Sequence, residues 1–323
     1  MSLGINTKAS SASQSREKAG AVVVKPIFLS GLGRSGTTII HTVLSEHRRA
    51  NWLSLLTARY PDRPWLNRWL MRGIDIPVLN IPLKWRFVPL ENYGFWTHYY
   101  GGFFRPCRDL GAGDATLKAR QSIRRVFSQL LTPARDRVLI KTTGMPRIGF
   151  LSNVFPDAKF IHVIRDGRAV AHSRMNVGFW RGWEGNLLWP GELPGHYRAE
   201  WENWQCSFVA LAGIEWKANM DLFEAVKRDC PQIKICEVRY ENFCADPVTE
   251  IKRMADFAEL EWTPEFEASV RNRHIGSENK KWQKDLTEEQ QDILNEVLRP
   301  YLVRYGYETE AKTQPMQTAA MKS

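Results

Sequence analysis

Long apolar runs and paired cysteines are both missing from the 323-residue sequence. No uninterrupted apolar stretch approaches the roughly 20 residues that a helix needs to span a bilayer. The N-terminus also lacks the hydrophobic core of a secretory signal. The five cysteines form neither a CxxC pair nor a His/Cys cluster at zinc spacing: Cys107, Cys206, Cys230, Cys236 and Cys244. These absences argue against a disulfide framework and a structural zinc site. They predict free thiols in a cytoplasmic protein without a transmembrane segment.

Acidic residues are outnumbered, with 35 Asp and Glu against 45 Lys and Arg, so the formal net charge is +10 and the isoelectric point is near 9.4. An excess of positive charge predicts anionic partners, and nucleic acid, an acidic membrane and a charged nucleotide all fit it. The basic residues are interspersed with tryptophans and form no run long enough for a nucleic-acid arm. We therefore expect no nucleic-acid partner, whereas peripheral contact with a membrane stays open.

The stretch from Ile27 to Leu44, IFLSGLGRSGTTIIHTVL, passes from an apolar run through a glycine-bracketed loop into an amphipathic segment. This order is typical of a strand, a loop and a helix. Backbone N–H groups at the start of a helix bind phosphate, and hydroxyls and a planar guanidinium add further donors. The loop therefore predicts an anion site with Arg34 as its charged contact. Its residues are Gly33, Arg34, Ser35, Gly36, Thr37 and Thr38.

The lysine of the GxxxxGK[ST] motif is missing from this loop, because threonines stand where that motif has lysine. Nucleoside-triphosphatase chemistry relies on this lysine and on Mg²⁺ held by the following hydroxyl. The missing lysine weakens a triphosphatase interpretation. The sequence also offers no carboxylate cluster for Mg²⁺, so we expect no metal.

A second stretch, FIHVIRDGRAVAHSRM from Phe160 to Met175, again runs from an apolar strand into a helix, with Arg165 at the strand end and Ser173 within the helix. The order GRSGTT followed far downstream by RDGRxxxxS resembles the sulfotransferases that use 3′-phosphoadenosine 5′-phosphosulfate (PAPS). The resemblance continues through RYENFCADP and GSENKKW and spans most of the chain from Ile27 to Tyr307. It is closer to the carbohydrate, tyrosylprotein and bacterial branch than to the cytosolic small-molecule branch.

The resemblance implies roles for several residues in binding PAPS. In the family the first loop holds the 5′-phosphosulfate, and residues spaced as Arg165 and Ser173 hold the 3′-phosphate. Lys141, which closes the LIKTT strand, resembles a lysine that reaches the leaving oxygen. Tyr240 resembles a tyrosine that contacts the adenine. Lys281 is similar to a lysine that closes over the 3′-phosphate, with the preceding lysine as the alternative.

The general base is where the chain departs from the small-molecule sulfotransferases. Their Lys-Thr-His segment, whose histidine is the base, is replaced here by Lys141, Thr142 and Thr143. Threonine does not act as a base at neutral pH, and the carbohydrate and tyrosylprotein sulfotransferases use a glutamate. We expect Glu91 to be the base, because it stands among aromatic residues in VPLENYGFWTHYY, where partial desolvation suits a base that works near neutrality. His98 is the second candidate, since imidazole is a common general base.

Helical stretches alternate with short apolar strands along the chain. This predicts an α/β fold with a central parallel sheet, helices on both faces and a P-loop-like nucleotide-binding core. Ligands bind such sheets at the carboxyl ends of the strands, where both arginine-bearing loops are expected. The predicted strands are Val22–Ser30, Val138–Lys141, Phe160–Ile164 and Ile233–Val238, and the predicted helices include Leu117–Leu131, Glu200–Lys227 and those opening at Asp246 and Thr287. Pro300 is expected to kink or end the last helix.

The predicted domain organisation has three parts. Residues 1–22 form a disordered tail, residues 23–307 a single sulfotransferase domain, and residues 308–323 a mobile C-terminal tail. Within the domain, the tryptophan-containing segments 51–115 and 176–204 are expected to face the acceptor. Segment 51–115 is too irregular to be assigned to helices or strands.

We therefore expect a PAPS-dependent sulfotransferase that moves a sulfuryl group in line to a hydroxyl of a carbohydrate, a lipid or another small molecule. An amine acceptor is less favoured. Two alternatives stay open: a nucleotide-dependent phosphotransferase or kinase that uses the same loop, and a non-enzymatic basic polyanion binder. The expected compartment is the cytoplasm, or the Golgi lumen if the chain is a truncated form of an enzyme like the anchored eukaryotic sulfotransferases.

Overall fold

The structure is a computed structural model that describes residues 22–103, 108–185, 187–188, 191–276 and 279–307. Internal contacts divide these residues into two compact units. Of the described residues, the first unit comprises those up to 165 together with 191–192 and 219–276, and the second comprises the others. The predicted tails 1–22 and 308–323 lie, except for Val22, outside the described residues. The single domain over 23–307 stays a prediction.

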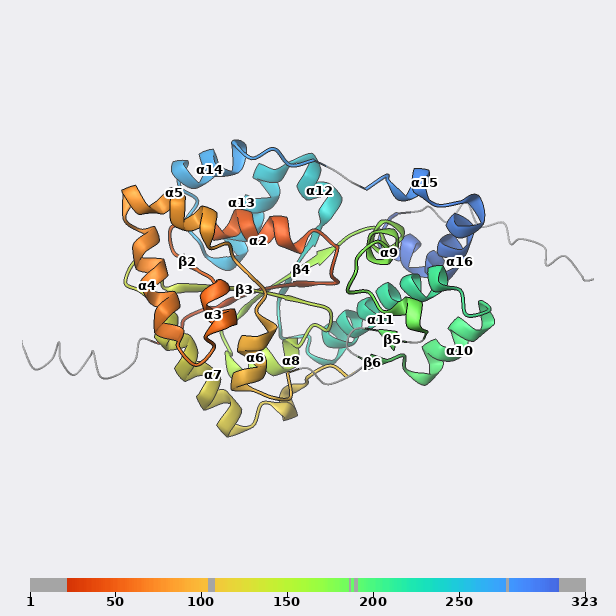
Figure 1. Ribbon diagram of the computed structural model, residues 1–323, viewed down its shortest axis with the longest axis horizontal. Coiled ribbons are helices and arrows are strands. Elements are labelled where there is room, and N and C mark those ends of the chain that lie inside the picture. Colours follow the sequence, from red (N-terminus) through yellow and green to blue (C-terminus); the bar gives the residue numbers. More distant parts are fainter. Residues whose placement is uncertain (1–21, 104–107, 186, 189–190, 277–278, 308–323) are drawn as a thin grey trace, which may run out of the picture. The chain divides into compact units, whose positions relative to one another are not determined.

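A five-stranded sheet forms the centre of the first unit, and each strand is parallel to its neighbours (Figure 1). The strand order is β2-β3-β1-β4-β7. The strands are β1 (Ile27–Gly31), β2 (Ala50–Asn51), β3 (Arg137–Thr143), β4 (Lys159–Ile164) and β7 (Ile235–Arg239). β1 begins later than the predicted Val22, because Lys25 has a φ of 46° and Pro26 has no N–H to donate to a neighbouring strand.

Alternate residues of the strands face two separate hydrophobic clusters. Ile27, Leu29 and Leu139 belong to one cluster, whereas Phe28 and Ile140 belong to the other. The first cluster is completed by α2 (Thr37–Ser45), α12 (Tyr240–Ala245), α13 (Pro247–Ala258) and α14 (Pro264–Arg271), and the second by α6 (Tyr93–Tyr99), α7 (Leu117–Leu130) and α8 (Ile148–Val154). These two sets of helices lie on opposite sides of the sheet in Figure 1. The predicted α/β fold with helices on both faces is therefore confirmed.

Segment 51–115, whose sequence is too irregular for an assignment, contains mainly helices among its described residues. Its elements are α3 (Leu55–Arg59), α4 (Pro64–Ile74), α5 (Pro77–Arg86), α6 and the 3-10 turn η1 (Ala112–Asp114). Pro64 and Pro77 stand in the first turn of their helices, where the N–H that proline lacks has no partner within the helix. The prolines that make the segment look irregular therefore mark helix starts.

Side-chain caps open α13 and α16 (Glu288–Arg304), as predicted. The Asp246 carboxylate accepts a hydrogen bond of 3.1 Å from the N–H of Thr249. Thr287 and Gln290 form a reciprocal capping box. Each cap satisfies N–H groups that the first turn of a helix leaves unpaired.

Pro300 lies inside α16, which continues to Arg304. Of the two expected outcomes, an end of the helix at this proline is therefore wrong, whereas a kink stays a prediction. Proline removes one N–H donor from the helix. However, the buried side chains of Leu298 and Leu302 stand on either side of it, so packing holds both halves of the helix.

The second unit is mainly helical. Its helices are α9 (Gly167–Met175), α10 (Gly195–Asn203), the first part of α11 (Phe208–Asp229), α15 (Trp282–Asp285) and α16, with the 3-10 turn η2 (Gly182–Glu184). Two further short strands among the described residues, β5 (Leu187–Leu188) and β6 (Gly191–Glu192), pair with each other. Arg174 and Glu215 form a buried ion pair, and Nε1 of Trp180 donates to the same carboxylate at 3.1 Å. This network ties α9 to α11 within the unit.

The predicted helix Glu200–Lys227 is interrupted between residues 203 and 208. α10 ends at Asn203 and α11 begins at Phe208. Between them, Gln205 and Cys206 have φ values of 53° and 58°. Two consecutive residues in the left-handed region cannot continue a right-handed helix, so the chain turns here despite its helical composition.

Candidate active site

The loop between β1 and α2 contains two residues with positive φ, Arg34 at 77° and Gly36 at 87°. The N–H of Ser35 donates to the carbonyl oxygen of Leu32 at 3.1 Å, which closes the turn. Gly36 precedes Thr37, the first residue of α2, and brings no side chain to accept from the N–H groups of the first turn. The start of α2 can therefore donate hydrogen bonds to an anion.

Gly36 lies directly against the ring of Tyr240. A Cβ atom added at Gly36 would lie 2.2 Å from Cδ2 of that ring. Only glycine fits this contact, and the positive φ favours glycine independently. Tyr240 directly follows β7, so the contact fixes the loop against the end of that strand.

Arg165 directly follows β4 and contacts both the loop and Tyr240. Its Nη1 donates to the carbonyl oxygen of Arg34 at 2.9 Å, and its Cζ lies 4.5 Å from the centroid of the Tyr240 ring. The residue is only 7% exposed. A guanidinium held between a carbonyl and an aromatic face brings a fixed positive charge to this edge of the sheet.

Lys141 brings a second buried cation to the loop, from β3. It is paired with Leu29 of β1 in the sheet, and its Nζ donates to Oγ1 of Thr38 at 3.0 Å. The ammonium therefore lies at the first turn of α2. His41, at the next turn, has its pKa lowered to about 3, mainly by burial and further by the charge of Lys141.

Glu91 reaches the same lysine from the segment between α5 and α6. Its Oε2 lies 3.7 Å from Nζ of Lys141. Its Oε1 accepts hydrogen bonds from the N–H of Thr143 and the hydroxyl of Tyr93. Burial, and next the negative charge of Glu91, raises the pKa of Tyr93, so this phenol remains a donor. One carboxylate oxygen is thus held in place while the other faces the ammonium.

Four neighbouring strands of the sheet contribute to this site. The loop follows β1, Lys141 lies near the end of β3, Arg165 follows β4 and Tyr240 follows β7. Because the strands are parallel, their carboxyl ends share one edge. Both arginine-bearing loops are therefore at the predicted edge. The first unit brings together the loop residues 33–38 and four further predicted residues: Glu91, Lys141, Arg165 and Tyr240.

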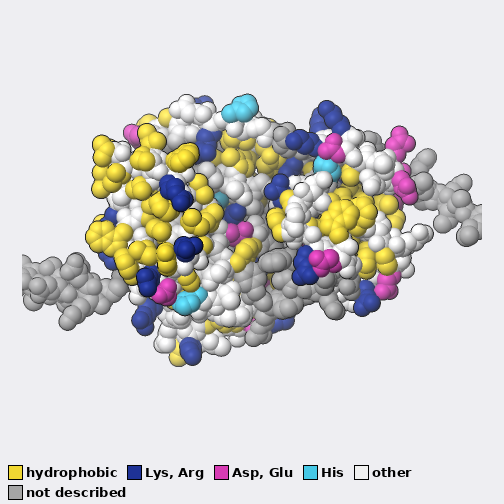
Figure 2. Space-filling model, in the orientation of Figure 1, with side chains coloured by type: hydrophobic (Ala, Val, Ile, Leu, Met, Phe, Trp, Pro, Cys, Tyr) yellow, Lys and Arg dark blue, Asp and Glu magenta, His cyan; other side chains and the backbone are white. Residues whose placement is uncertain are grey.

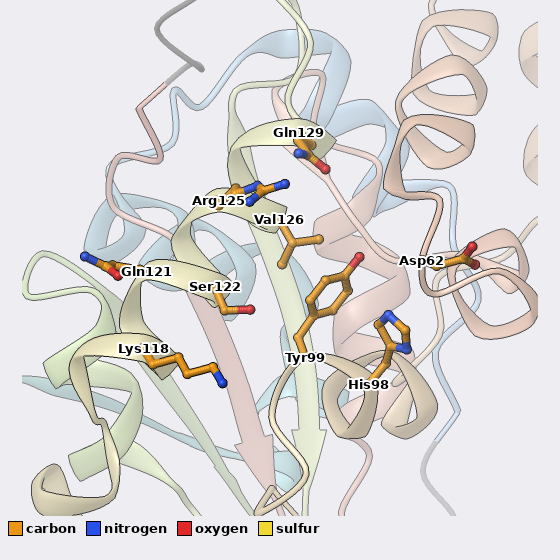
Figure 3. A pocket seen from close by; sticks show the side chains of 9 residues that line it. All are labelled: Asp62, His98, Tyr99, Lys118, Gln121, Ser122, Arg125, Val126 and Gln129. Atoms are coloured by element: carbon orange, nitrogen blue, oxygen red, sulfur yellow. The ribbon is translucent and has the colours of Figure 1, made fainter.

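His98, the second candidate base, lies on the exposed side of α6. It lines a hollow together with Asp62, Tyr99 and several residues of α7 (Figure 3). The α7 residues include Lys118 and Arg125. None of the side chains that line this hollow belongs to the loop 33–38, so the structure separates His98 from the contacts around Lys141.

Ser173 and Lys281 belong to the second unit. Ser173 is partly buried on α9, and Lys281 is exposed immediately before α15. On α9, the guanidinium of Arg168 pairs with Asp166 at 2.9 Å, and its Cζ lies 4.6 Å from the ring centroid of Trp282. The roles of Ser173 and Lys281 stay predictions from the resemblance.

Tyr93 contributes to the site but was not identified from the sequence. Its hydroxyl lies 2.6 Å from Oγ1 of Thr143 in addition to contacting Glu91. Asn92 between them has a φ of 57°, which turns the chain so that the side chains on both sides of it reach Thr143. The only sequence signal was its position two residues after the candidate base.

The sequence matches the sulfotransferase family over residues 26–264. Stf3 of Mycobacterium bovis, an omega-hydroxy-beta-dihydromenaquinone-9 sulfotransferase, and the protein of the same name from Mycobacterium tuberculosis are 23% identical to it over 325 residues, covering 88% of this chain and 75% of theirs. The solved structure of sulfotransferase STF9 from Mycobacterium avium has a TM-score of 0.55 and 17% identity, covering 92% of this chain and 80% of that chain. The structural likeness shows a shared fold.

The matched stretch includes the loop after β1 and the residues around it, Glu91, Lys141, Arg165 and Tyr240. It covers well over half of the chain. This protein therefore belongs to the sulfotransferase family and is an enzyme that transfers the sulfuryl group of PAPS to an acceptor.

Proposed function

We propose that the loop 33–38 binds the 5′-phosphosulfate of PAPS and that the edge of the sheet around it is the transfer site. The observation that carries this proposal is the contact of Lys141 with Thr38, because it puts an ammonium beside helix N–H groups that no side chain caps. Arg34 and Arg165 add positive charge to the same loop. Such an arrangement suits a ligand with several negative charges.

The fit to an adenosine nucleotide rests on Gly36, Arg165 and Tyr240. The close contact of Gly36 with the Tyr240 ring keeps the loop backbone within reach of a ligand that lies beside that ring. We propose that Tyr240 contacts the adenine and that Arg165 binds the 3′-phosphate. Ser173 and Lys281, in the second unit, stay predicted contacts of the same phosphate.

We propose that Lys141 stabilises the leaving oxygen and that Glu91 accepts the proton of the acceptor. In the reaction the acceptor oxygen forms a bond to sulfur, the bond from sulfur to the bridging phosphate oxygen breaks, and adenosine 3′,5′-bisphosphate is released. The ammonium of Lys141 opposes negative charge that grows on the bridging oxygen. Oε2 of Glu91 is the oxygen available for the proton, because Oε1 already accepts two hydrogen bonds.

Glu91 is preferred to His98 as the base because of its contacts. Lys141 contacts both Glu91 and the first turn of α2. His98, in contrast, lines a hollow that includes none of the loop residues. A general base must lie within hydrogen-bonding reach of the proton that it removes.

We propose an alcohol as the acceptor, whether on a lipid, a carbohydrate or another small molecule. The name of the Stf3 relatives describes an omega-hydroxy lipoquinone as their acceptor. That name supports an alcohol attached to an apolar body. The cytoplasmic location stays a prediction from the sequence.

The proposal is tested by incubating the purified full chain with ³⁵S-labelled PAPS and a panel of fatty alcohols, sterols and oligosaccharides. We expect labelled sulfate ester and an equal amount of adenosine 3′,5′-bisphosphate. Lys141→Met should lower kcat by about 10²- to 10³-fold. Turnover of ATP that requires Mg²⁺ would indicate a phosphotransferase instead. Binding that collapses with salt and ignores the 3′-phosphate would indicate a polyanion binder.

A further inference from the structure

α5 is a helix without a single buried residue, although seven of the ten residues in its sequence PVLNIPLKWR are apolar. Val78, Ile81 and Trp85 are 81%, 78% and 84% exposed. Their spacing of three and four residues puts them on one face of the helix. A surface helix of a folded protein normally turns such a face toward the core, so the exposed apolar face of α5 calls for a separate explanation.

The exposed apolar surface continues onto α4. Here we define the α4–α5 surface as the exposed large apolar residues of these helices and the turn between them: Trp65, Trp69, Ile76, Val78, Leu79, Ile81 and Trp85. In Figure 2, hydrophobic side chains gather over the region of α4 and α5, interspersed with Lys and Arg. Seven large side chains in one contiguous stretch exceed the scattered exposure that is ordinary on a protein surface.

The opposite side of this pair of helices is already packed. Leu70, Met71 and Ile74 of α4 form a buried cluster with Trp52, and Leu83 of α5 packs against that cluster. The helices are therefore anchored in the first unit by a separate set of side chains. The residues of the α4–α5 surface are not needed for that anchoring and remain available for a partner.

The charges on this stretch have one dominant sign. Residues 64–86 contain four basic residues and one acidic residue, Asp75. Asp75 already accepts a hydrogen bond of 2.8 Å from Nε of Arg135. Arg72 and Arg86 are exposed, and Cζ of Arg72 lies 5.8 Å from the ring centroid of Trp69. An apolar surface with exposed tryptophans and guanidinium groups is complementary to a partner that is both apolar and anionic.

A second copy of the chain does not meet this requirement. A two-fold symmetric pair would set the α4–α5 surface against itself, so that two stretches with four basic residues and one already paired acidic residue each would face one another. The net charge of +10 adds to this repulsion.

We propose that the α4–α5 surface docks the protein on a bilayer that contains anionic lipids. Interfacial helices combine a tryptophan-rich apolar face with Lys and Arg that contact lipid headgroups, and they lie in the plane of the membrane. α5 has ten residues, too few to span a bilayer. Among the described residues no helix is long and apolar enough to cross a membrane. The protein thus binds the membrane from one side, with Val78, Ile81 and Trp85 inserted at the boundary between headgroups and acyl chains.

Docking also defines where the acceptor is presented. Glu91 follows the end of α5 by five residues, so the segment that carries the candidate base starts at the docked helix. Provided that the proposed function holds, this favours an alcohol of a membrane-resident lipid over a free sugar. The docking itself does not depend on sulfuryl transfer and is measured without it.

Flotation of the full chain with vesicles tests the proposal. We expect the wild-type chain to bind vesicles of phosphatidylcholine with phosphatidylglycerol, to bind phosphatidylcholine alone more weakly, and to bind less as salt is added.

The double variant Ile81→Asp/Trp85→Asp should bind the anionic vesicles at least about tenfold more weakly than the wild type. Leu117→Asp is the matched control, because Leu117 is an apolar residue of the same unit, 63% exposed but on α7, and this variant should bind like the wild type. Unchanged affinity for adenosine 3′,5′-bisphosphate in both variants shows that the nucleotide site is intact.

Wild-type affinity of the double variant for anionic vesicles would overturn the proposal. So would a wild-type chain that does not float with vesicles but forms a dimer that the double variant breaks. If the double variant fails to fold, quenching of tryptophan fluorescence by brominated phosphatidylcholine decides instead. A smaller quenched fraction in Trp85→Phe than in the wild type supports docking through α5, and an equal fraction refutes it.

Discussion

Nζ of Lys141 lies 3.7 Å from Oε2 of Glu91, and the same ammonium donates to Oγ1 of Thr38 at 3.0 Å. One lysine therefore contacts both the first turn of α2, the helix proposed to bind the phosphosulfate, and the carboxylate proposed as the base. Under the proposed mechanism, the group that stabilises the leaving oxygen and the group that accepts the proton of the acceptor therefore form an ion pair with each other. Their charges also stabilise each other when no substrate separates them.

Glu91→Gln is expected to remove sulfuryl transfer and to leave nucleotide binding unchanged. Glutamine keeps an oxygen that accepts from Thr143 and Tyr93 but cannot take a proton from the acceptor. Loss of a general base lowers kcat by about 10²- to 10⁴-fold. Steady-state transfer from labelled PAPS measures kcat, and calorimetry with adenosine 3′,5′-bisphosphate measures binding.

His98→Asn is the matched comparison for Glu91→Gln, since it also replaces a titratable side chain by an amide. We expect it to retain wild-type kcat, because His98 lines a hollow without loop residues. If activity survives in Glu91→Gln but disappears in His98→Asn, the assignment of the base must be reversed.

Gly36→Ala is expected to weaken the binding of adenosine 3′,5′-bisphosphate by more than tenfold. The added Cβ would lie 2.2 Å from Tyr240, so either the loop or the ring must move. Alanine at a positive φ also lowers the free energy of unfolding by about 1 kcal/mol. Gly144→Ala separates the two effects, because Gly144 has a φ of 78° but no atom within 4 Å of its added Cβ. That control should lose stability and keep its affinity, and equal losses of affinity would show that the Tyr240 contact is irrelevant.

Much of the fold could be predicted from local sequence patterns. The apolar runs of β3 and β4 and the capping residues Asp246 and Thr287 are signals that lie within a few residues of the structure they define. The helices of segment 51–115 could not be assigned, because prolines at helix starts look like helix breakers until the helix register is known. The break between α10 and α11 depends on the φ angles of Gln205 and Cys206, and neither residue type signals a turn.

The candidate site likewise contains residues that local sequence patterns indicate and one residue that only the fold reveals. The loop 33–38 and Arg165 belong to contiguous motifs, so the sequence alone makes them candidates. Tyr93 was missed because its role depends on the left-handed conformation of Asn92, which brings two neighbouring side chains to Thr143. Contacts between segments far apart in the chain leave no such local pattern.

Arg165→Ala is expected to abolish the preference for a 3′-phosphate. The ratio of affinities for adenosine 3′,5′-bisphosphate and adenosine 5′-phosphate should fall by about 10- to 100-fold, as for the loss of one charge-assisted contact. Calorimetry with both nucleotides measures this ratio. Arg135→Ala is the control, because Arg135 is also buried but pairs with Asp75. It should lower stability without altering the ratio, and a preference retained in Arg165→Ala would remove Arg165 from the phosphate site.

His41 is expected to make the fold sensitive to acid. Its pKa is about 3 in the folded chain against 6.5 for an unperturbed histidine, so between these pH values the unfolded chain binds a proton that the native chain does not. The free energy of unfolding must then decrease as the pH falls through this window, and the full contribution is present above pH 6.5. Between pH 7.5 and pH 5.0 this single group accounts for about 2 kcal/mol.

The variant His41→Gln tests this origin, because glutamine does not titrate. Urea unfolding at pH 7.5 and pH 5.0 should show a smaller difference in the free energy of unfolding for His41→Gln than for the wild type. His98→Gln makes the same substitution at an exposed position and should keep the wild-type difference. Equal pH dependence in the wild type and His41→Gln would mean that burial of His41 at the first turns of α2 does not control acid stability.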